Sequence, residues 1–290
     1  MTGVASSHPA GEVNARRPPG RPRRGWGDHV VVLVATIATL FLGLPVVALT
    51  VRAFVNGAIG VALTSEVVLT ALALSLVTTA VSLVLVVVLG LPLAFVLARR
   101  RFRGQWLVES VVDLPIVLPP SVAGLALLLV FGRRGIIGET LAVAGIEVPF
   151  TVVAVVLAQT FVAAPFFIRS ARAGLVGVDR EIEDAARVDG ASERYLFRRI
   201  TVPLAAQTLA AGIVMSWARA LGEFGATIMF AGNIEGRTQT LPLVVYAEFQ
   251  GGDLDASVAA AAILIMAALG VLLAVRVFHW GRVLDVRSVG

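Results

Sequence analysis

The chain has 290 residues, of which 58% are hydrophobic and 15% are charged, and its mean hydropathy is +0.90. Average proteins carry roughly 25% charged residues, so this composition excludes a soluble globular protein, a disordered chain and a disulfide scaffold. All 24 cations are arginine, which excludes a P-loop lysine, and any ATP hydrolysis coupled to this chain must come from another polypeptide. We therefore predict an all-α polytopic membrane protein that is not itself an enzyme.

The first predicted element is an N-terminal tail, residues 1–28, which is rich in arginine and proline. A segment of this composition cannot bury a core, so we expect it to be disordered. No small-residue cleavage site follows the first apolar block, so the segment does not read as a cleavable signal. Its expected role is to help set the topology and to contact anionic membrane lipid.

Six apolar blocks follow that are long enough to cross a bilayer, which takes about 20 residues. They lie at 29–51, 67–97, 114–131, 150–168, 208–230 and 258–278. The second block would extend over about 46 Å as a straight helix, so it should tilt, or leave the bilayer near Pro92. The third contains Pro115, Pro119 and Pro120, and proline is tolerated where neighbouring protein or water satisfies the freed carbonyls. The third block is therefore predicted to lie inside the bundle.

The distribution of arginine predicts the orientation. Nineteen of the arginines fall in the N-terminal tail, after the second block, after the fourth block and at the C-terminal end. Only four lie in the three intervening loops. Because arginine-rich loops stay in the cytoplasm, both termini are predicted to be cytoplasmic, with the chain in the plasma or inner membrane. The predicted parts are a transmembrane domain at 29–280, a cytoplasmic loop at 169–207 and a C-terminal tail at 281–290.

The long cytoplasmic loop is patterned as two short helices. Asp179 predicts an N-cap followed by acidic residues in the first turn, and Gly190 predicts a left-handed C-cap. Ser192 predicts a second N-cap, for a helix over 193–201 that ends at Pro203. We therefore expect a pair of helices joined by a glycine bend at the cytoplasmic face.

Two surfaces of this loop predict docking. Ala185 and Ala186 form a small-residue surface that another backbone can approach closely. An apolar stripe that must be buried against something is formed by Tyr195, Leu196, Phe197 and Ile200. An amphipathic helix lying on lipid explains the same pattern, so the residues alone leave both interpretations open.

Six residues of the loop stand at fixed spacings, namely Asp184, Ala185, Ala186, Gly190, Ile200 and Pro203. Their pattern resembles the EAA loop of the permease subunits of binding-protein-dependent ABC importers. Two departures are mild: Asp184 stands in place of Glu, and Val202 in place of Leu. The resemblance implies a type I ABC importer permease fold with six transmembrane helices, and a homodimer. It also implies two copies of a cytoplasmic ATPase that hold this coupling loop (169–207), and an extracytoplasmic oxyanion-binding protein.

Further stretches resemble one branch of that family. Residues 218–227 read ARALGEFGAT, which is similar to the fifth span of molybdate and sulfate permeases. Residues 232–242, GNIEGRTQTLP, and 118–124, LPPSVAG, look more like the molybdate permeases. The resemblance covers about 65–275 and implies import of molybdate or a related tetrahedral oxyanion. Sulfate, thiosulfate and tungstate are the alternative substrates.

Arg219 and Glu223 lie four residues apart in the fifth block, and so would share one face of a helix. Either charge alone near the bilayer centre costs roughly 2.5–3.5 kcal/mol, so we predict that they pair and face the protein interior. Two interpretations stay open. The pair lines the translocation path, with Pro119 and Pro120 as further candidate pathway or gate residues, or it locks helix packing at the dimer axis.

Other classes of function fit less well. An ion-coupled secondary transporter needs no ATPase-docking loop and typically shows structural repeats, and a membrane-embedded enzyme needs more polar groups inside the membrane. The three histidines lack metal-ligand spacing, and no catalytic, cofactor-binding or metal site is predicted. Glu109 and Asp113 are expected to pair with the arginines at 99–103. The arginine-rich loops lack interleaved aromatic residues, so no nucleic-acid partner is predicted.

Overall fold

The computed structural model of this chain describes residues 26–287, with side chains described except at 26–28, 58, 61 and 274–287. All regular structure in that range is helical. The expectation of disorder at residues 1–28 lies outside the described residues as far as residue 25, and the last three residues of the predicted C-terminal tail also lie outside them. The chain divides into two units, residues 1–48 and 49–290.

In the first unit, the described residues form most of helix α1 (Trp26–Val55). Its segment His29–Val55 is long and apolar enough to span a membrane, and Pro45 lies inside the helix without ending it. Large apolar side chains are exposed along this helix, as a lipid-facing helix requires. The predicted first block at 29–51 therefore corresponds to a helix that ends four residues later than expected.

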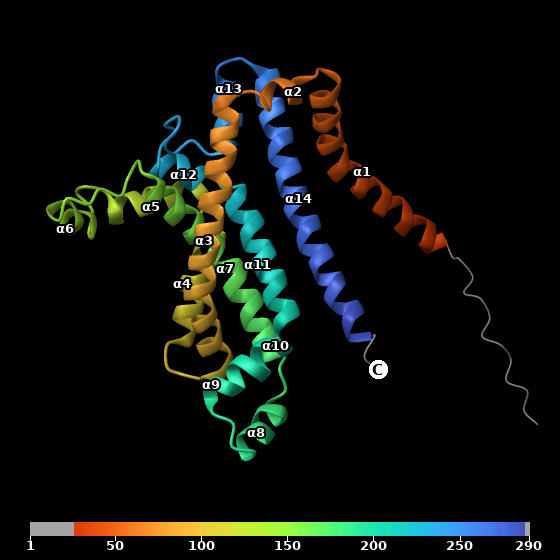
Figure 1. The fold of residues 1–290 in the computed structure, drawn as a ribbon, viewed down its shortest axis with the longest axis vertical. Coiled ribbons are helices and arrows are strands. Elements are labelled where there is room, and N and C mark those ends of the chain that lie inside the picture. The colour runs from red at the N-terminus through yellow and green to blue at the C-terminus, as the bar shows by residue number, and fades with distance from the viewer. Residues whose placement is uncertain (1–25, 288–290) are drawn as a thin grey trace, which may run out of the picture. The chain divides into compact units, whose positions relative to one another are not determined.

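The second unit contains the remaining helices. In chain order they are α2 (Ala58–Ala62), α3 (Glu66–Arg99), α4 (Gln105–Val117), α5 (Pro120–Phe131), α6 (Gly138–Val143), α7 (Val152–Val176), α8 (Arg180–Val188), α9 (Glu193–Leu196), the π-helical turn η1 (Phe197–Thr201), α10 (Val202–Leu204), α11 (Ala206–Leu221), α12 (Gly225–Phe230), α13 (Leu241–Gln250) and α14 (Leu254–Arg287). Figure 1 labels them. Helix α14 continues past residue 280, where the C-terminal tail was predicted to begin.

The structure supports an all-α polytopic membrane fold. Within residues 26–287, the spans that are long and apolar enough to cross a membrane lie in α1, α3, α7 and α14. Two further candidate spans are pairs of helices that are bent at a short break. One pair is α4 with α5, and the other is residues 193–204 with α11. The described part of the chain thus contains four candidate spans, or six when each bent pair counts as one.

The third predicted block is broken. Helix α4 ends at Val117, and α5 begins at Pro120 at an angle of 119° to it. A residue before proline is driven out of the helical region, and Leu118 is accordingly extended, with a ψ of 134°. The third block is therefore interrupted at its prolines and changes direction there, and the segment lies against the bundle.

The fifth predicted block is also interrupted. Helix α11 ends at Leu221, and three residues separate it from α12. The second block behaves differently, because α3 stays helical through Pro92 as far as Arg99. A Cβ built at Gly90 would come within 3.0 Å of the Phe167 ring, so this glycine allows α3 to pack closely on α7.

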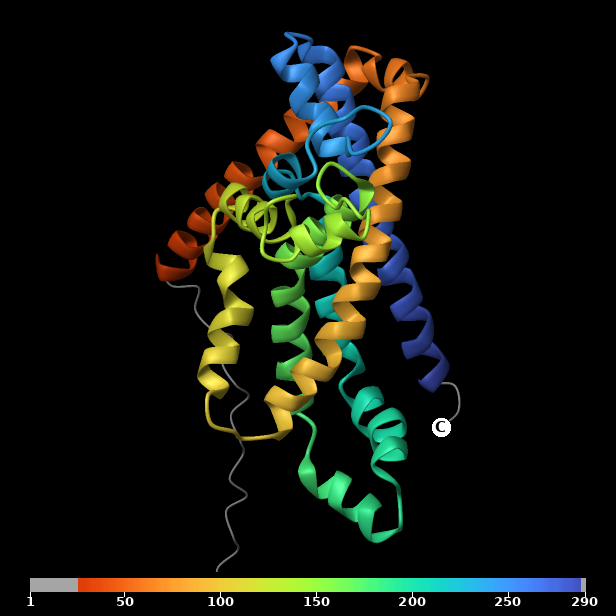
Figure 2. The ribbon, with the colours of Figure 1, turned by 90° about the vertical axis from the view of Figure 1, so that its left-hand side faces the viewer.

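Helix α7 is the centre of the second unit, packed against α3 and α11 (Figure 1). The Ser170 hydroxyl donates to the Thr208 carbonyl at 2.8 Å, and the Ser216 hydroxyl donates to the Ala163 carbonyl at 3.0 Å. Helices α8 to α10 lie at one end of this unit, and α2 and α13 lie at the other (Figures 1 and 2). We call these the coupling end and the opposite end.

Candidate functional site

Helix α8 forms as the sequence predicts. The Asp179 carboxylate accepts the Glu181 backbone N–H at 2.9 Å, which satisfies one free donor of the first turn. Gly190 has a φ of +86°, and the backbone N–H of Ala191 returns to the Ala186 carbonyl at 2.9 Å. This is the left-handed helix end that glycine favours. Both predicted caps and the glycine bend are confirmed.

The second helix begins as predicted but ends later. The Ser192 hydroxyl accepts the Tyr195 N–H at 3.3 Å, and α9 starts at Glu193. The chain then passes through the π-helical turn η1 into α10, where Pro203 is the second residue and lies in the first turn. Proline is tolerated there because the first turn of a helix leaves its N–H groups free. At the N-terminal end of the coupling loop, residues 169–176 belong to α7. The segment that follows α7 is therefore shorter than the predicted loop at 169–207.

The motif residues of α8 and of the glycine bend after it form an accessible surface. Asp184, Ala185 and Gly190 are exposed, and Ala186 is half-buried. The neighbouring apolar side chains Ile182 and Val188 are exposed as well, with Val188 at 87%. Exposed apolar groups beside small residues suit close contact with another protein.

The apolar stripe after Ser192 is only partly buried within this chain. Leu196 is buried, and the Phe197 ring packs edge-on against Phe95 of α3 with centroids 5.0 Å apart. Tyr195 remains exposed, and Ile200 is half-buried. Tyr195 therefore remains available for contact with a partner or with lipid, and that part of the expectation stays a prediction.

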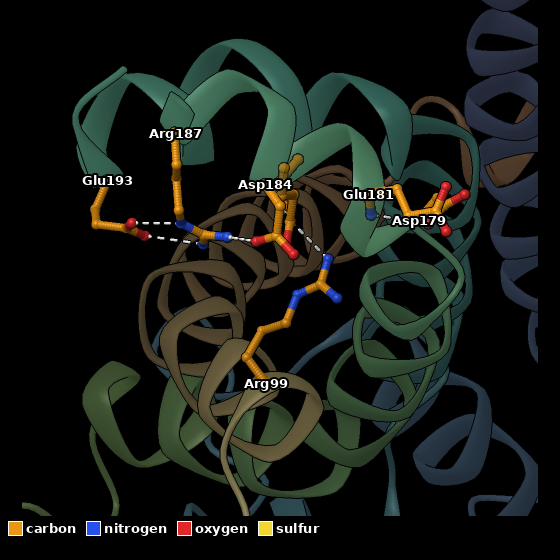
Figure 3. Close-up of polar contacts among 8 residues, drawn as sticks. Arg99, Asp179, Glu181, Asp184, Arg187 and Glu193 are labelled. Atoms are coloured by element: carbon orange, nitrogen blue, oxygen red, sulfur yellow. Dashed lines mark hydrogen bonds and ion pairs between the residues drawn. The ribbon is translucent and has the colours of Figure 1, made fainter. Parts of the chain in front are cut away.

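Ion pairs tie the two short helices to each other. Arg187 lies between Asp184 and Glu193, with N–O distances of 2.7 Å to each (Figure 3). The hydrogen bond to Arg187 lowers the pKa of the Glu193 carboxyl, and the pKa of Arg187 is raised by its hydrogen bonds to Glu193 and Asp184. A lowered carboxyl pKa means that the contact stabilises the fold above the ordinary glutamate pKa and is lost only in stronger acid.

A buried ion pair joins α8 to the end of α3, and no local sequence pattern predicts it. The guanidinium of Arg99, the last residue of α3, lies 2.6 Å from the carboxylate of Glu183 in α8. The Thr201 hydroxyl donates to the same carboxylate oxygen at 2.7 Å. Spacing could have predicted only the side of the helix on which Glu183 lies. Glu183 stands three residues before Ala186, so both lie on the side of α8 that turns toward the bundle.

Arg219 and Glu223 form the predicted ion pair, at 2.6 Å. They do not share one uninterrupted helix, because Glu223 lies in the break after α11. Its other carboxylate oxygen accepts the Ala226 N–H at 2.7 Å, which satisfies a free donor in the first turn of α12. The Glu223 side chain is fully buried, whereas that of Arg219 is 28% exposed.

The predicted gate prolines lie beside this break. Pro119 and Pro120 begin α5, and a Cβ built at Gly225 would meet the Pro120 side chain at 2.7 Å. A Cβ built at Gly124, one turn further along α5, would lie 2.6 Å from the Ala226 carbonyl oxygen. The structure thus brings the start of α5, the start of α12 and the buried carboxylate of Glu223 into one region.

The expected partners of Glu109 and Asp113 were wrong. Glu109 pairs with Arg172 at 2.8 Å, and Asp113 pairs with Arg169 at 2.6 Å. Both arginines lie on α7, against which α4 packs. The contacts join two helices that the sequence places far apart, so local spacing pointed to the wrong partners.

A second polar region lies at the start of α7, away from the coupling end. A cavity of about 530 Å³ is lined by residues that include Arg133, Glu147, Phe150 and Arg237. Arg133 pairs with Glu147 at 2.7 Å, and Phe150 has a φ of +60°. The described side chains contain no cluster of three or more His, Asp or Glu residues that could hold a metal ion.

Comparison with known proteins decides the family. Residues 87–280 match the family of binding-protein-dependent transport system inner membrane components. The chain belongs to this family. It is therefore a multi-pass membrane protein and a transport component, and its resemblance to the permease subunits of ABC importers is confirmed.

Curated relatives of this inner membrane component cover most of its length. A molybdenum transport system permease protein of Mycobacterium tuberculosis is 42% identical over 245 residues, 84% of this chain and 92% of the relative. A probable molybdenum ABC transporter permease of Haloferax volcanii is 38% identical over 271 residues, 90% of this chain and 96% of the relative. A sulfate transport system permease protein of Salmonella typhimurium is 37% identical, covering 65% of this chain and 68% of the relative.

Solved structures support the fold of this inner membrane component. A chain of a bacterial ABC transporter involved in alginate import superposes with a TM-score of 0.71, over 89% of this chain and 96% of that chain. The sequence identity is 20%, so this likeness concerns the fold alone. The predicted type I ABC importer permease fold is confirmed.

Proposed function

We propose that this chain is the membrane-spanning subunit of an ABC importer that carries molybdate into the cytoplasm, with ATP hydrolysed by a separate subunit. The observation that carries the substrate is the 38–42% identity to molybdenum permeases over 84–90% of the chain. The sulfate permease relative aligns over a shorter stretch, 65% of the chain. Molybdate and sulfate are both tetrahedral oxyanions, so sulfate, thiosulfate and tungstate transport are the alternatives.

The coupling loop is proposed to face the cytoplasm and to dock into the ATPase. The exposed surface around Ala185 and Val188 on α8 supports this assignment. Two copies of the chain, each with one ATPase, would form the working assembly, and an extracytoplasmic binding protein would deliver the anion. A bacterial alginate transporter of similar fold has been crystallised in complex with its periplasmic protein.

The Arg219–Glu223 pair supports a division of roles. Glu223 is fully buried and holds the first turn of α12, so its proposed role is structural. Arg219 keeps part of its side chain accessible, and a partly accessible guanidinium presents positive potential to an oxyanion. A pathway must bind weakly enough to let its substrate leave, and pairing with Glu223 reduces the net charge that Arg219 presents.

The test is uptake by proteoliposomes that contain this chain, its ATPase and its binding protein. We expect molybdate to accumulate only when ATP is present on the ATPase side. An excess of tungstate should compete, and an excess of sulfate should not. If sulfate at the same concentration as molybdate abolished molybdate uptake, the substrate would be sulfate and not molybdate. ATP-independent uptake driven by an ion gradient would contradict the importer class.

A further inference from the structure

Among the residues of α8, Glu183 is the one whose side chain is buried. Glu183 is 3% exposed, whereas the other residues of α8 are exposed or, at Ala186, half-buried. The hydrogen bonds of Arg187 join α8 to the neighbouring short helix and not to a membrane helix. Glu183 is therefore the point at which α8 meets α3.

The contact at Glu183 has three members. Its carboxylate lies 2.6 Å from the Arg99 guanidinium and accepts the Thr201 hydroxyl at 2.7 Å. The side chains of Arg99 and Glu183 are only 11% and 4% exposed. Figure 3 shows Arg99 reaching from the end of α3 toward α8. One carboxylate thus joins α3, α8 and η1.

The contact combines charged groups with apolar neighbours. A cavity of about 310 Å³ beside the contact is lined by charged residues that include Arg99, Arg180 and Glu183, and by the apolar side chains of Phe95 and Leu196. Apolar side chains slide past one another with little directional preference, whereas a charge-assisted hydrogen bond fixes both distance and direction. The buried contact therefore sets the position of α8 relative to α3.

The exposed surface and the buried contact occupy opposite sides of the same helix. Successive residues of an α-helix are rotated by about 100°, so Ala185 and Val188 project away from the side that carries Glu183. A partner that grips α8 at these two residues would pull directly against the Glu183 contact. Such a force passes to α3, which packs along α7.

We propose that Arg99, Glu183 and Thr201 form a latch that transmits movement of α8 to the membrane helices, with Glu183 as its positioning residue. The proposal rests on the function proposed above, in which an ATPase moves α8. Without the latch, α8 still docks to the ATPase through its exposed side, but its movement shifts α3 less. ATP hydrolysis then continues while import falls.

The test measures the number of molybdate ions imported per ATP hydrolysed in proteoliposomes of the complete complex. Glu183→Gln and Arg99→Gln should each lower this ratio by at least about fivefold, the lower end of typical coupling energies between sites. The double variant should have the same import-to-ATP ratio as either single variant, because each of the three variants breaks the same contact. The matched control is Asp255→Asn, which breaks the exposed Arg52–Asp255 pair at 3.2 Å and should leave the ratio unchanged.

Co-purification of the ATPase separates a latch from a merely structural contact, and it should be normal in Glu183→Gln. An unchanged ratio in assembled Glu183→Gln complexes overturns the latch. If that variant fails to assemble, Thr201→Val is used instead, because it removes one hydrogen bond and keeps the ion pair. A fall in the ratio smaller than that expected for Glu183→Gln supports the latch. An unchanged ratio overturns it. Import by the wild type tests the proposed function separately. A wild type that imports nothing overturns that function, and the latch with it.

Discussion

Gly190 shows how one backbone conformation shapes the candidate docking site. Its φ of +86° lies in the left-handed region, where a residue with a Cβ is disfavoured by about 1–2 kcal/mol. A Cβ built at this position meets nothing within 4 Å, so the cost of substitution comes from the backbone alone. The glycine is therefore required by the bend between α8 and α9, and not by the space around it.

The expected result follows from that distinction. Gly190→Val should weaken binding of the ATPase, measured as the fraction that co-purifies with the detergent-solubilised chain. Gly190→Asn should retain most of the binding, because asparagine visits the left-handed region more readily than other residues do. Equal binding by the valine variant and the wild type would show that the bend is not needed for docking.

Arg219 tests the two interpretations of the buried pair. Arg219→Gln leaves the fully buried Glu223 carboxylate without its ion partner, and Arg219→Lys keeps a positive charge. If Arg219 presents charge to the anion, Arg219→Lys should keep substantial molybdate uptake while Arg219→Gln lowers uptake by about tenfold, a change of about 1.4 kcal/mol. The thermal midpoint of each purified variant is the control. If both variants lose uptake and both have a lowered thermal midpoint, the pair has a structural role alone.

At the scale of helices, the sequence predicted what local chemistry determines. Asp179 and Ser192 begin short helices, and Gly190 ends one, through contacts within a few residues. All three were predicted correctly. The break between α4 and α5 was missed as a change of direction, although its prolines were noticed. Proline reveals where a helix stops, but the 119° turn that follows depends on how α5 packs against α12.

Long-range partners were beyond local patterns. Glu109 and Asp113 were assigned to arginines a few residues away, yet they pair with Arg169 and Arg172 on α7. Glu183 was overlooked because a glutamate in the first turn of a helix is already explained by the helix dipole. Its burial against Arg99 depends on where α3 ends relative to α8, and the sequence does not display that distance.

Close approach of α7 and α11 can be tested through a pair of glycines. A Cβ at Gly212 would come within 2.8 Å of the Ser170 Cβ, whereas a Cβ at Gly270 in α14 meets nothing within 4 Å. Gly212→Ala should destabilise the protein by about 1–3 kcal/mol, the usual cost of overpacking, and lower its thermal midpoint in detergent. Gly270→Ala should leave the midpoint unchanged or raise it slightly. A Gly212→Ala variant as stable as wild type would show that these helices can separate at little cost.

At the scale of the second unit, the coupling end and the region at the start of α7 differ in chemistry. The coupling end carries α8 with its exposed apolar surface, and the start of α7 carries a cavity lined by Arg133 and Arg237. Both arginines belong to loops predicted to lie outside the cytoplasm, where arginine is scarce in this sequence. Composition predicted which loops differ in charge. It did not predict that these two arginines line one cavity, because that depends on the packing of α5 and α12 around α7.

The central claim is that α8 faces the cytoplasm and is gripped there by an ATPase. The chain contains no cysteine, so Val188→Cys introduces a single thiol at an 87% exposed position of α8. A membrane-impermeant maleimide should label this thiol from the cytoplasmic side of inverted vesicles and not from the outside of intact cells. Labelling should slow by at least tenfold when the ATPase is bound. Labelling from outside, or an unchanged rate in the complex with the ATPase, would contradict the claim.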